Sequence, residues 1–199
     1  MPDLSRVIGA FAKTPLYSWD GSTWVDTGTN WRIQVFDRFI TERAFGQKKR
    51  IATTPGEVSV DPALVYRFGD SELRYLMENA VPDIEGSTQY ATVATFRVAS
   101  TQVRIERNLT TTSQSGVKIR DGVEVVATTF ADIGRYTDVN SKAFDSVSYS
   151  IFDVVLPAGC PITTDCRVVV VGTGEVLAVD EVFTVLELTG ARCTSHGNQ

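Results

Sequence analysis

The stretch AGCPITTDCRVVVVGTGEVLAVD, residues 158–180, contains a glycine turn, a polar approach with an aspartate, an apolar strand, a second glycine turn and a returning strand. An earlier stretch, PGEVSVDPALVYRFGDSELRYLM, residues 55–77, follows the same order of features. With one gap in each stretch, four identical pairs align: Gly56 with Gly159, Asp61 with Asp165, Gly69 with Gly172, and Glu72 with Glu175. Two explanations are open, an internal duplication of a β-unit or a chance similarity between two β-hairpins.

Most of the remaining chain is also typical of β-structure. In LYSWDGSTWVDTG, residues 16–28, an Asp-Gly pair lies between β-forming residues and predicts a hairpin with Trp19 and Trp24 on either side of the turn. VKIRDGVEVV, residues 117–126, predicts a second hairpin that turns at Asp121 and Gly122. Helix is expected only over residues 2–12, with at most one turn near 131–145.

The predicted fold class is therefore mainly β. We expect twisted antiparallel sheets that form a small β-barrel or sandwich, with a short N-terminal helix and projecting hairpins. No clean linker divides the chain, so residues 1–199 are expected to form a single compact β-rich body. If the chain holds two β-units, they cover about residues 14–100 and 101–190, and a polar tail follows at 191–199.

The predicted hairpin at residues 117–126 is a candidate arm. Its polar residues Lys118, Arg120 and Glu124 are unsuited to a core, and the serine- and threonine-rich connector TTTSQSG precedes it. We therefore expect it to project from the body and to contact another subunit, with Lys118 and Arg120 as candidate interface residues.

Length and charge limit the classes of function. With 199 residues, the chain can bury one substantial core or two small ones. Its net charge of −5 argues against a protein whose main role is to grip nucleic acid, although it leaves room for a local basic patch. No window approaches the ~18 apolar residues of a membrane span. The short apolar patch at residues 7–12 is a poor secretory signal, so we expect assembly in the cytoplasm and no membrane partner.

The three cysteines do not form a recognisable reactive site. An odd number argues against a disulfide framework. Cys160 and Cys166 are separated by five residues, which is not a zinc-site spacing, and the single histidine, His196, lies near the C-terminus. We predict that Cys160 lies at a turn, that Cys166 begins a strand, and that both are scaffold.

Other sequence patterns that could indicate an active site are equally weak evidence for catalysis. The Gly-x-Gly of GTGEV at residues 172–176 follows a strand, but no helix or P-loop lysine follows it, so it predicts a hairpin turn. Four carboxylates are spread through loops and strands without a spacing that pairs them: Asp132, Asp138, Asp145 and Asp153. The sequence therefore predicts a protein that is not an enzyme, with no metal and no cofactor.

Two clusters are candidate contact surfaces. Trp19 and Trp24 belong to an aromatic group that could stack on sugar rings, but we favour packing or a protein interface. The strongest basic cluster contains Arg43, Lys48, Lys49 and Arg50. It is suited to DNA phosphates or to an acidic partner surface, and a solvated loop is an equal alternative.

The segment DVVLPAGCPITTDCRVVVVGTGEVLAVDEV, residues 153–182, resembles the small β-barrel head-closure, or head–tail joining, proteins of tailed bacteriophages. The shared features are an apolar strand, a Pro/Gly turn, a polar approach with an aspartate, a strand, a glycine turn and a return strand. Here these features are Leu156, Pro157, Gly159, Asp165, Val168 to Val171, Gly172, Val179 and Val182.

This resemblance implies a non-enzymatic structural protein that forms a homo-oligomeric ring, twelvefold or sixfold, at the neck of the virion. Its partners would be the portal or an adaptor protein and tail proteins, and phage DNA would pass through the lumen without sequence-specific binding. Such a protein would assemble in the host bacterial cytoplasm. Tail-terminator, collar and capsid-decoration proteins are related alternatives, and a carbohydrate- or host-surface-binding β-module is an alternative of another class.

Overall fold

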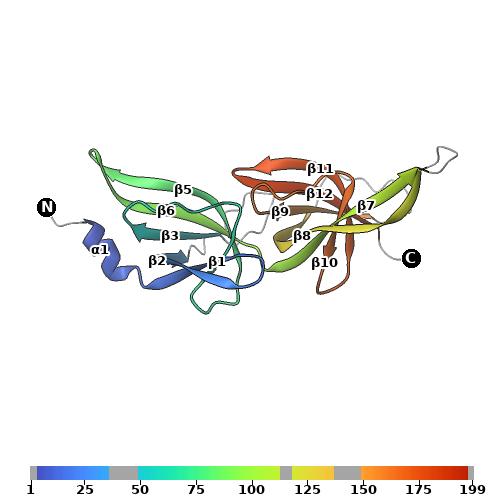
Figure 1. Cartoon of the computed structure of the whole chain (residues 1–199). Coiled ribbons are helices and arrows are strands. Elements are labelled where there is room, and N and C mark those ends of the chain that lie inside the picture. Colours follow the sequence, from blue (N-terminus) through green and yellow to red (C-terminus); the bar gives the residue numbers. More distant parts are fainter. Residues whose placement is uncertain (1–3, 36–48, 113–117, 137–148, 197–199) are drawn as a thin grey trace.

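Two β-barrels follow one another along the chain (Figure 1). The computed structural model describes residues 4–35, 49–112, 118–136 and 149–196. The first barrel follows helix α1 (Leu4–Phe11) and contains β1 (Thr14–Trp19), β2 (Trp24–Val35), β3 (Lys49–Pro55), β4 (Val65–Phe68), β5 (Tyr75–Glu85) and β6 (Thr88–Val98). The second contains β7 (Thr101–Thr112), β8 (Lys118–Tyr136), β9 (Tyr149–Leu156), β10 (Cys166–Val170), β11 (Val176–Val185) and β12 (Leu188–His196). The expected mainly β fold with a short N-terminal helix is confirmed.

Both barrels have the same strand order. The first is ordered β1-β2-β3-β6-β5-β4 and closes through β4 and β1, and the second is ordered β7-β8-β9-β12-β11-β10 and closes through β10 and β7. Each strand of the second barrel therefore occupies the position of the strand six earlier. The two similar sequence stretches also fall on equivalent elements, since one passes through β4 to β5 and the other through β10 to β11. This correspondence supports a duplication over a chance similarity.

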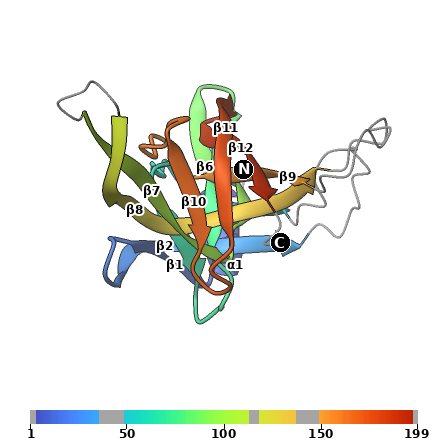
Figure 2. The ribbon, with the colours of Figure 1, turned by 90° about the vertical axis from the view of Figure 1, so that its right-hand side faces the viewer.

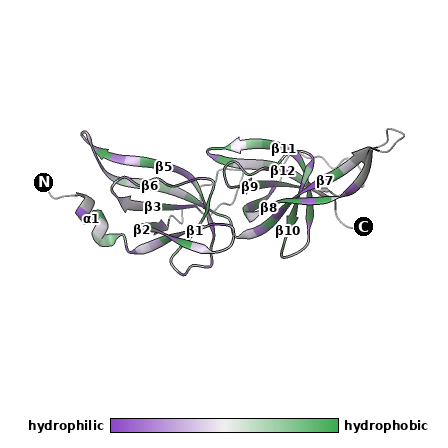
Figure 3. Cartoon of the chain, viewed as in Figure 1, coloured by the Kyte–Doolittle hydropathy of each residue, from purple (hydrophilic) through white to green (hydrophobic). Residues whose placement is uncertain are grey.

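Hydrophobic and hydrophilic residues are interspersed along the strands of both barrels (Figure 3), and the buried ones form the cores. Along β11, Leu177 and Val179 point inward and are buried, while Val176 and Ala178 point outward. The first core contains the aromatic residues Trp31, Tyr66, Phe68, Tyr75 and Phe96. The second is mainly aliphatic, with Val103, Ile105, Val154, Leu156, Val168 and Leu177.

The link between the barrels is short. Strand β6 ends at Val98 and β7 begins at Thr101, so only Ala99 and Ser100 separate them. Ala99 is fully buried, and its amide donates a hydrogen bond of 2.8 Å to the carbonyl of Arg74.

The predicted turn at Asp121 and Gly122 is wrong. Strand β8 runs without a break from Lys118 to Tyr136 and pairs with β7, with Gly122 opposite Leu109 and Arg120 opposite Thr110. Asp121 is the extra residue of a β-bulge, and Gly122 has a φ of 145°, which glycine tolerates best. The long partner strand β7 overrides the local turn preference of the Asp-Gly pair.

A projecting arm is nevertheless present, with different bounds. Strand β7 pairs with β10 only as far as Arg107, and β8 pairs with β9 only from Asp132 onward. Within the described residues, the outer parts of β7 and β8 therefore pair only with each other, and they extend from the barrel in two views (Figures 1 and 2). We call residues 108–112 with 118–125 the arm.

The expected polar tail also differs from the structure. Residues 191–196 belong to β12, which pairs with β9 and β11, and Ala191 and Cys193 are fully buried. The second barrel therefore extends to His196, beyond the expected end at 190. Residues 131–136, where a helical turn was expected, lie in β8, and 137–145 lie outside the described residues.

Candidate interface site

A third apolar cluster joins the two barrels. Val65, Leu76 and Ala99 contribute from the first barrel and the link, and Val155 and Leu188 contribute from the second. Trp19, Trp24 and Phe130 pack against this cluster. The backbone also crosses the junction, because the amide of Ala158 donates to the carbonyl of Pro62 at 2.9 Å. The barrels thus share a core where they meet.

A chain of charges crosses the same junction. Glu78 is 0% exposed and accepts a hydrogen bond of 2.7 Å from Nε of Arg97, which is 4% exposed. The ammonium of Lys49 lies 3.0 Å from the second oxygen of Glu78, and Arg97 Nη1 donates to Asp132 of the second barrel at 3.2 Å. Burial raises the pKa of Asp132, while Arg97 acts in the opposite direction. A buried acid of the first barrel is thereby connected to a carboxylate of the second.

The predicted basic cluster is divided. Lys49 and Arg50 lie in β3, and the ion pair with Glu78 ties Lys49 to the junction. Arg43 and Lys48 lie outside the described residues.

The tryptophan hairpin forms as predicted. Trp19 and Trp24 end β1 and begin β2, pair across the turn and have ring centroids 5.2 Å apart. The Asp20 carboxylate closes the turn by accepting hydrogen bonds from the amides of Thr23 and Ser22 at 2.7 and 2.8 Å. These bonds lower the pKa of Asp20. Both tryptophans are partly buried, as expected for packing residues.

Two arginines that sequence reasoning missed alternate with aromatic rings at this hairpin. The guanidinium carbon of Arg67 lies 5.0 Å from the ring centroids of both Tyr17 and Trp24. That of Arg74 lies 4.8 Å from Trp24 and 5.7 Å from Phe130 of the second barrel. We call these five residues the arginine–aromatic ladder. Cation–π contacts of this kind stabilise a junction, and they occupy the Trp24 ring that a sugar would need.

The arginine–aromatic ladder could not be predicted from the sequence, because the pairing of distant strands brings its residues together. Arg67 is directly opposite Tyr17 in the β1–β4 ladder, although fifty residues separate them in the chain. Arg74 is held by its backbone surroundings, since its Nη1 donates to the carbonyls of Ser71 and Glu72 at 3.1 and 2.7 Å. The contacts of Arg67 and Arg74 with the aromatic rings therefore leave no periodic pattern in the nearby sequence.

The arm carries the remaining candidates. Lys118 and Arg120 lie in β8, paired with Thr112 and Thr110, and their side chains are outside the described part of the structure. Leu109, Val123 and Val125 of the arm are exposed apolar residues. The arm therefore offers apolar contact area that the sequence prediction, based on polar residues, did not include.

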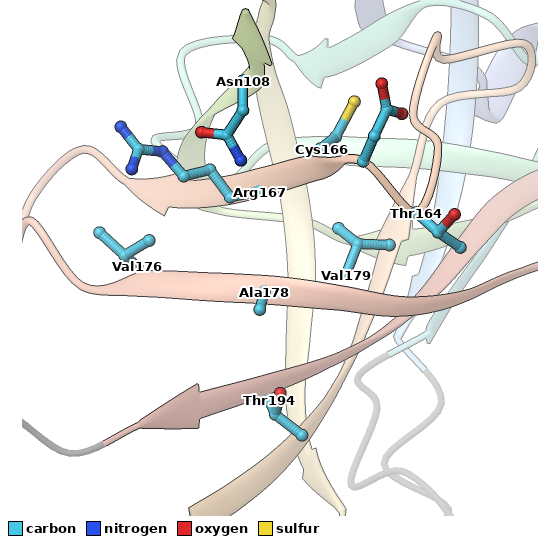
Figure 4. Close-up of a pocket in the computed structure, with 9 residues that line it drawn as sticks. Asn108, Thr164, Cys166, Arg167, Val176, Ala178, Val179 and Thr194 are labelled. Atoms are coloured by element: carbon cyan, nitrogen blue, oxygen red, sulfur yellow. The ribbon is translucent and has the colours of Figure 1, made fainter. Parts of the chain in front are cut away.

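A pocket of about 370 Å³ opens on the second barrel beside β10 and β11 (Figure 4). Cys166 lies at its wall with its sulfur 3.2 Å from the Thr163 hydroxyl, and Arg167 is engaged by Glu106 at 2.7 Å. Cys160 lies in the turn after Pro157, and Cys166 begins β10, as predicted.

The thiols of Cys160 and Cys193 have little nucleophilic character. Burial raises the pKa of Cys160 to about 11 and that of Cys193 to about 12, so both are protonated at neutral pH. Within the described ranges, no three His, Cys, Asp or Glu side chains are grouped to hold a metal ion. Asp153 and Asp132 are engaged by Arg192 and Arg97, while Asp138 and Asp145 are outside the described residues.

Comparisons with protein-family models, curated proteins and solved structures found no match for this chain. In the part of the chain that the structure describes, the one helix is too short to cross a membrane.

Proposed function

We propose that this chain is a structural virion protein that forms a ring at the neck of a tailed phage, where it connects the portal or head to the tail. The observation that carries this proposal is the arm. Two joined barrels provide a rigid body, and the arm adds a two-stranded extension with unpaired edges and exposed Leu109, Val123 and Val125. Such a form suits a subunit that is completed by its neighbours.

Unpaired strand edges favour association. Each backbone group on the outer edge of the arm has a hydrogen-bonding capacity that a strand of another chain can satisfy. Exposed apolar side chains on the same extension add area that water hydrates poorly. Together they support contact with another copy or with a neighbouring ring.

In the proposed ring, each copy uses two different surfaces, so that head-to-tail contacts close into a twelvefold or sixfold assembly. The portal or an adaptor would lie on one side and tail proteins on the other. The net charge of −5 suits a lumen through which DNA passes without adhering. Localisation in the virion, assembly in the bacterial cytoplasm and the absence of catalysis belong to the same proposal.

Electron microscopy of the purified protein and of its parent particle tests this function. The expected result is a closed ring of this chain between head and tail. A ring at the distal end of the tail, a collar, or copies spread over the capsid would favour the tail-terminator, collar or decoration alternatives. Single scattered copies, or copies only on fibre tips, would refute the connector role.

A further inference from the structure

Arg67 and Arg74 are two positive groups that form no close ion pair among the described residues, and only the charge of Glu72 acts favourably on Arg74. Both guanidinium centres lie within 5.0 Å of the same Trp24 ring. Among the described residues, neither forms an ion pair, whereas Arg97, Arg167 and Arg192 each pair with a carboxylate. The ladder is therefore a site where positive charge has been gathered by the fold and only partly compensated.

The local chemistry at the ladder favours an anion. The Nε atoms of Arg67 and Arg74 are both buried and have no hydrogen-bond acceptor within the described structure, so an incoming anion would have to meet the outer Nη groups. Burial and the charge of Arg67 lower the pKa of Arg74, and the nearby charge of Glu72 offsets only part of this effect. Aromatic faces relieve part of this penalty, but a guanidinium binds most strongly to a carboxylate or phosphate.

We propose that the ladder receives the carboxylates of the β5–β6 hairpin of a second copy of this chain, an inference that rests on the proposed ring. Residues 79–96 contain Asp83 and Glu85 and no lysine or arginine, while Glu78, at the junction end of β5, is buried and paired with Arg97. At the hairpin, Val81 is 49% and Ile84 54% exposed, and Glu85 is exposed. The hairpin thus presents negative charge beside apolar side chains, which complements arginines set among aromatic rings.

The hairpin of one molecule is badly placed to reach its own ladder. Strand β5 begins at the junction, where Leu76 belongs to the shared apolar cluster, and runs to Glu85 at the other end. Nine residues of strand span about 30 Å. The hairpin tip lies at the end of the first barrel away from the second barrel (Figure 1), whereas the ladder includes Phe130 of the second barrel.

A contact between these two surfaces is head-to-tail. Each copy would offer its hairpin to one neighbour and its ladder to the other, which is the arrangement that a closed ring requires. Asp83 is bonded to the Tyr90 hydroxyl and raises the pKa of that group, so Glu85 is the freer carboxylate of the two. Glu85 is accordingly the residue expected to meet Arg67 and Arg74.

Zero-length cross-linking tests the contact directly. Arg67→Lys keeps the positive charge and supplies an amine that a carbodiimide can join to a carboxylate. Equal amounts of unlabelled and ¹⁵N-labelled variant are mixed, assembled and treated, and the joined peptides are identified by mass spectrometry. The expected product joins residue 67 to the peptide containing Asp83 and Glu85, with mixed labels. Arg32→Lys, at another arginine on the first barrel, is the matched control and should not give that product.

Charge reversal adds a reciprocal test. Glu85→Lys should lower ring association by about tenfold or more, and combining it with Arg67→Glu should restore much of the loss. Glu187→Lys, at the exposed tip between β11 and β12, changes the same charge elsewhere and should leave association unchanged. Thermal unfolding of each variant verifies that the barrels remain folded; if Arg67→Glu unfolds, the cross-link and Glu85→Lys decide alone.

The outcomes distinguish a failure of the proposed ladder–hairpin contact from a failure of the proposed neck function. Rings that form without the cross-link, and that tolerate Glu85→Lys, overturn the contact and leave the neck proposal standing. Loss of oligonucleotide binding in Arg67→Glu with unchanged rings would assign the ladder to nucleic acid and also overturn it. A protein that is monomeric in solution and in its particle overturns both.

Discussion

The first barrel surrounds aromatic rings, while the second surrounds mostly aliphatic side chains, although both have the same strand order. In the first, Phe96 contacts Phe68 and Trp31 edge to face, with ring centroids 5.0 and 5.9 Å apart. In the second, Ile105 and Leu177 occupy the core without an aromatic partner among its buried members. The shared strand order therefore depends on the alternation of inward and outward residues and on the turns. The types of side chain that fill the core can differ between the two barrels.

The largest expected effect comes from removing one core. Phe96→Ala should lower the free energy of unfolding by about 3–5 kcal/mol, and Leu177→Ala in the second barrel by about 2–5 kcal/mol. Because the barrels share an apolar cluster, each variant should unfold in one transition, measured in urea by tryptophan fluorescence and by circular dichroism. All three tryptophans lie in the first barrel, so separated transitions would show that the barrels are independent.

The buried charges at the junction come next. Arg97→Met would leave Glu78 buried beside Lys49 alone, and we expect a loss of about 3 kcal/mol in chemical denaturation. Glu181→Gln, which breaks an exposed pair with Arg192, is the control and should change stability by less than about 1 kcal/mol. Equal losses in the two variants would contradict the importance of the junction.

Removing the centre of the ladder should have a smaller effect. Trp24 is partly buried, so Trp24→Ala should destabilise the protein by about 2 kcal/mol, below the range of a fully buried tryptophan. Thermal unfolding measures the loss, and a glycan array measures sugar binding in parallel. If the variant kept its stability but lost binding to a sugar, the carbohydrate-module alternative would replace the connector.

Two carboxylates should respond to pH in opposite directions. Burial disfavours the charge of Glu106, but bonds from Arg167 and Arg104 outweigh this and lower its pKa, so its stabilisation is present above pH 4.5 and lost as pH falls below that value. The pKa of Asp132 is raised above 3.8, so its contribution to stability decreases as pH rises through the region above that value. Stability titrations of Glu106→Gln and Asp132→Asn should therefore change slope with opposite signs.

The smallest effect is expected for the cysteines. Cys160→Ser with Cys166→Ala should change the free energy of unfolding by only about 1–2 kcal/mol and leave assembly of the proposed ring intact, because Cys166 contributes mainly as a small buried side chain. Zinc in metal analysis of the native protein, or unfolding in mild reductant, would show that these residues are more than scaffold.

The two Asp-Gly pairs explain how far sequence reasoning extends. At Asp20 and Gly21 the pair forms the predicted turn, because two tryptophans pair on either side and the aspartate bonds the following amides. At Asp121 and Gly122 the same dipeptide lies within a strand, because β7 continues opposite it. Local sequence chemistry was therefore enough to predict most strands and the hairpin turn at Asp20. It could not predict the bulge at Asp121, because that bulge depends on the partner strand β7.

The residues at the junction between the barrels show the same limit of sequence-based prediction. The sequence singled out Trp19 and Trp24 by their place around the Asp20 turn and Lys49 by its basic neighbours, but it gave no sign of Glu78, which pairs with Lys49 at the junction. Arg67 and Arg74 are isolated arginines in the sequence, seven residues apart and without a basic neighbour, and only the fold brings them to one ring. Sites made by pairing across a barrel have no fixed spacing along the chain.

The two-residue link between the barrels has a mechanical consequence. Ala99 is buried and its amide is bonded to Arg74, so the connection contains no spare length. Twisting one barrel against the other would stretch that hydrogen bond and open the shared apolar cluster. We therefore expect the two barrels to turn as one stiff element, and an assembly of such chains to bend at the contacts between copies rather than within them.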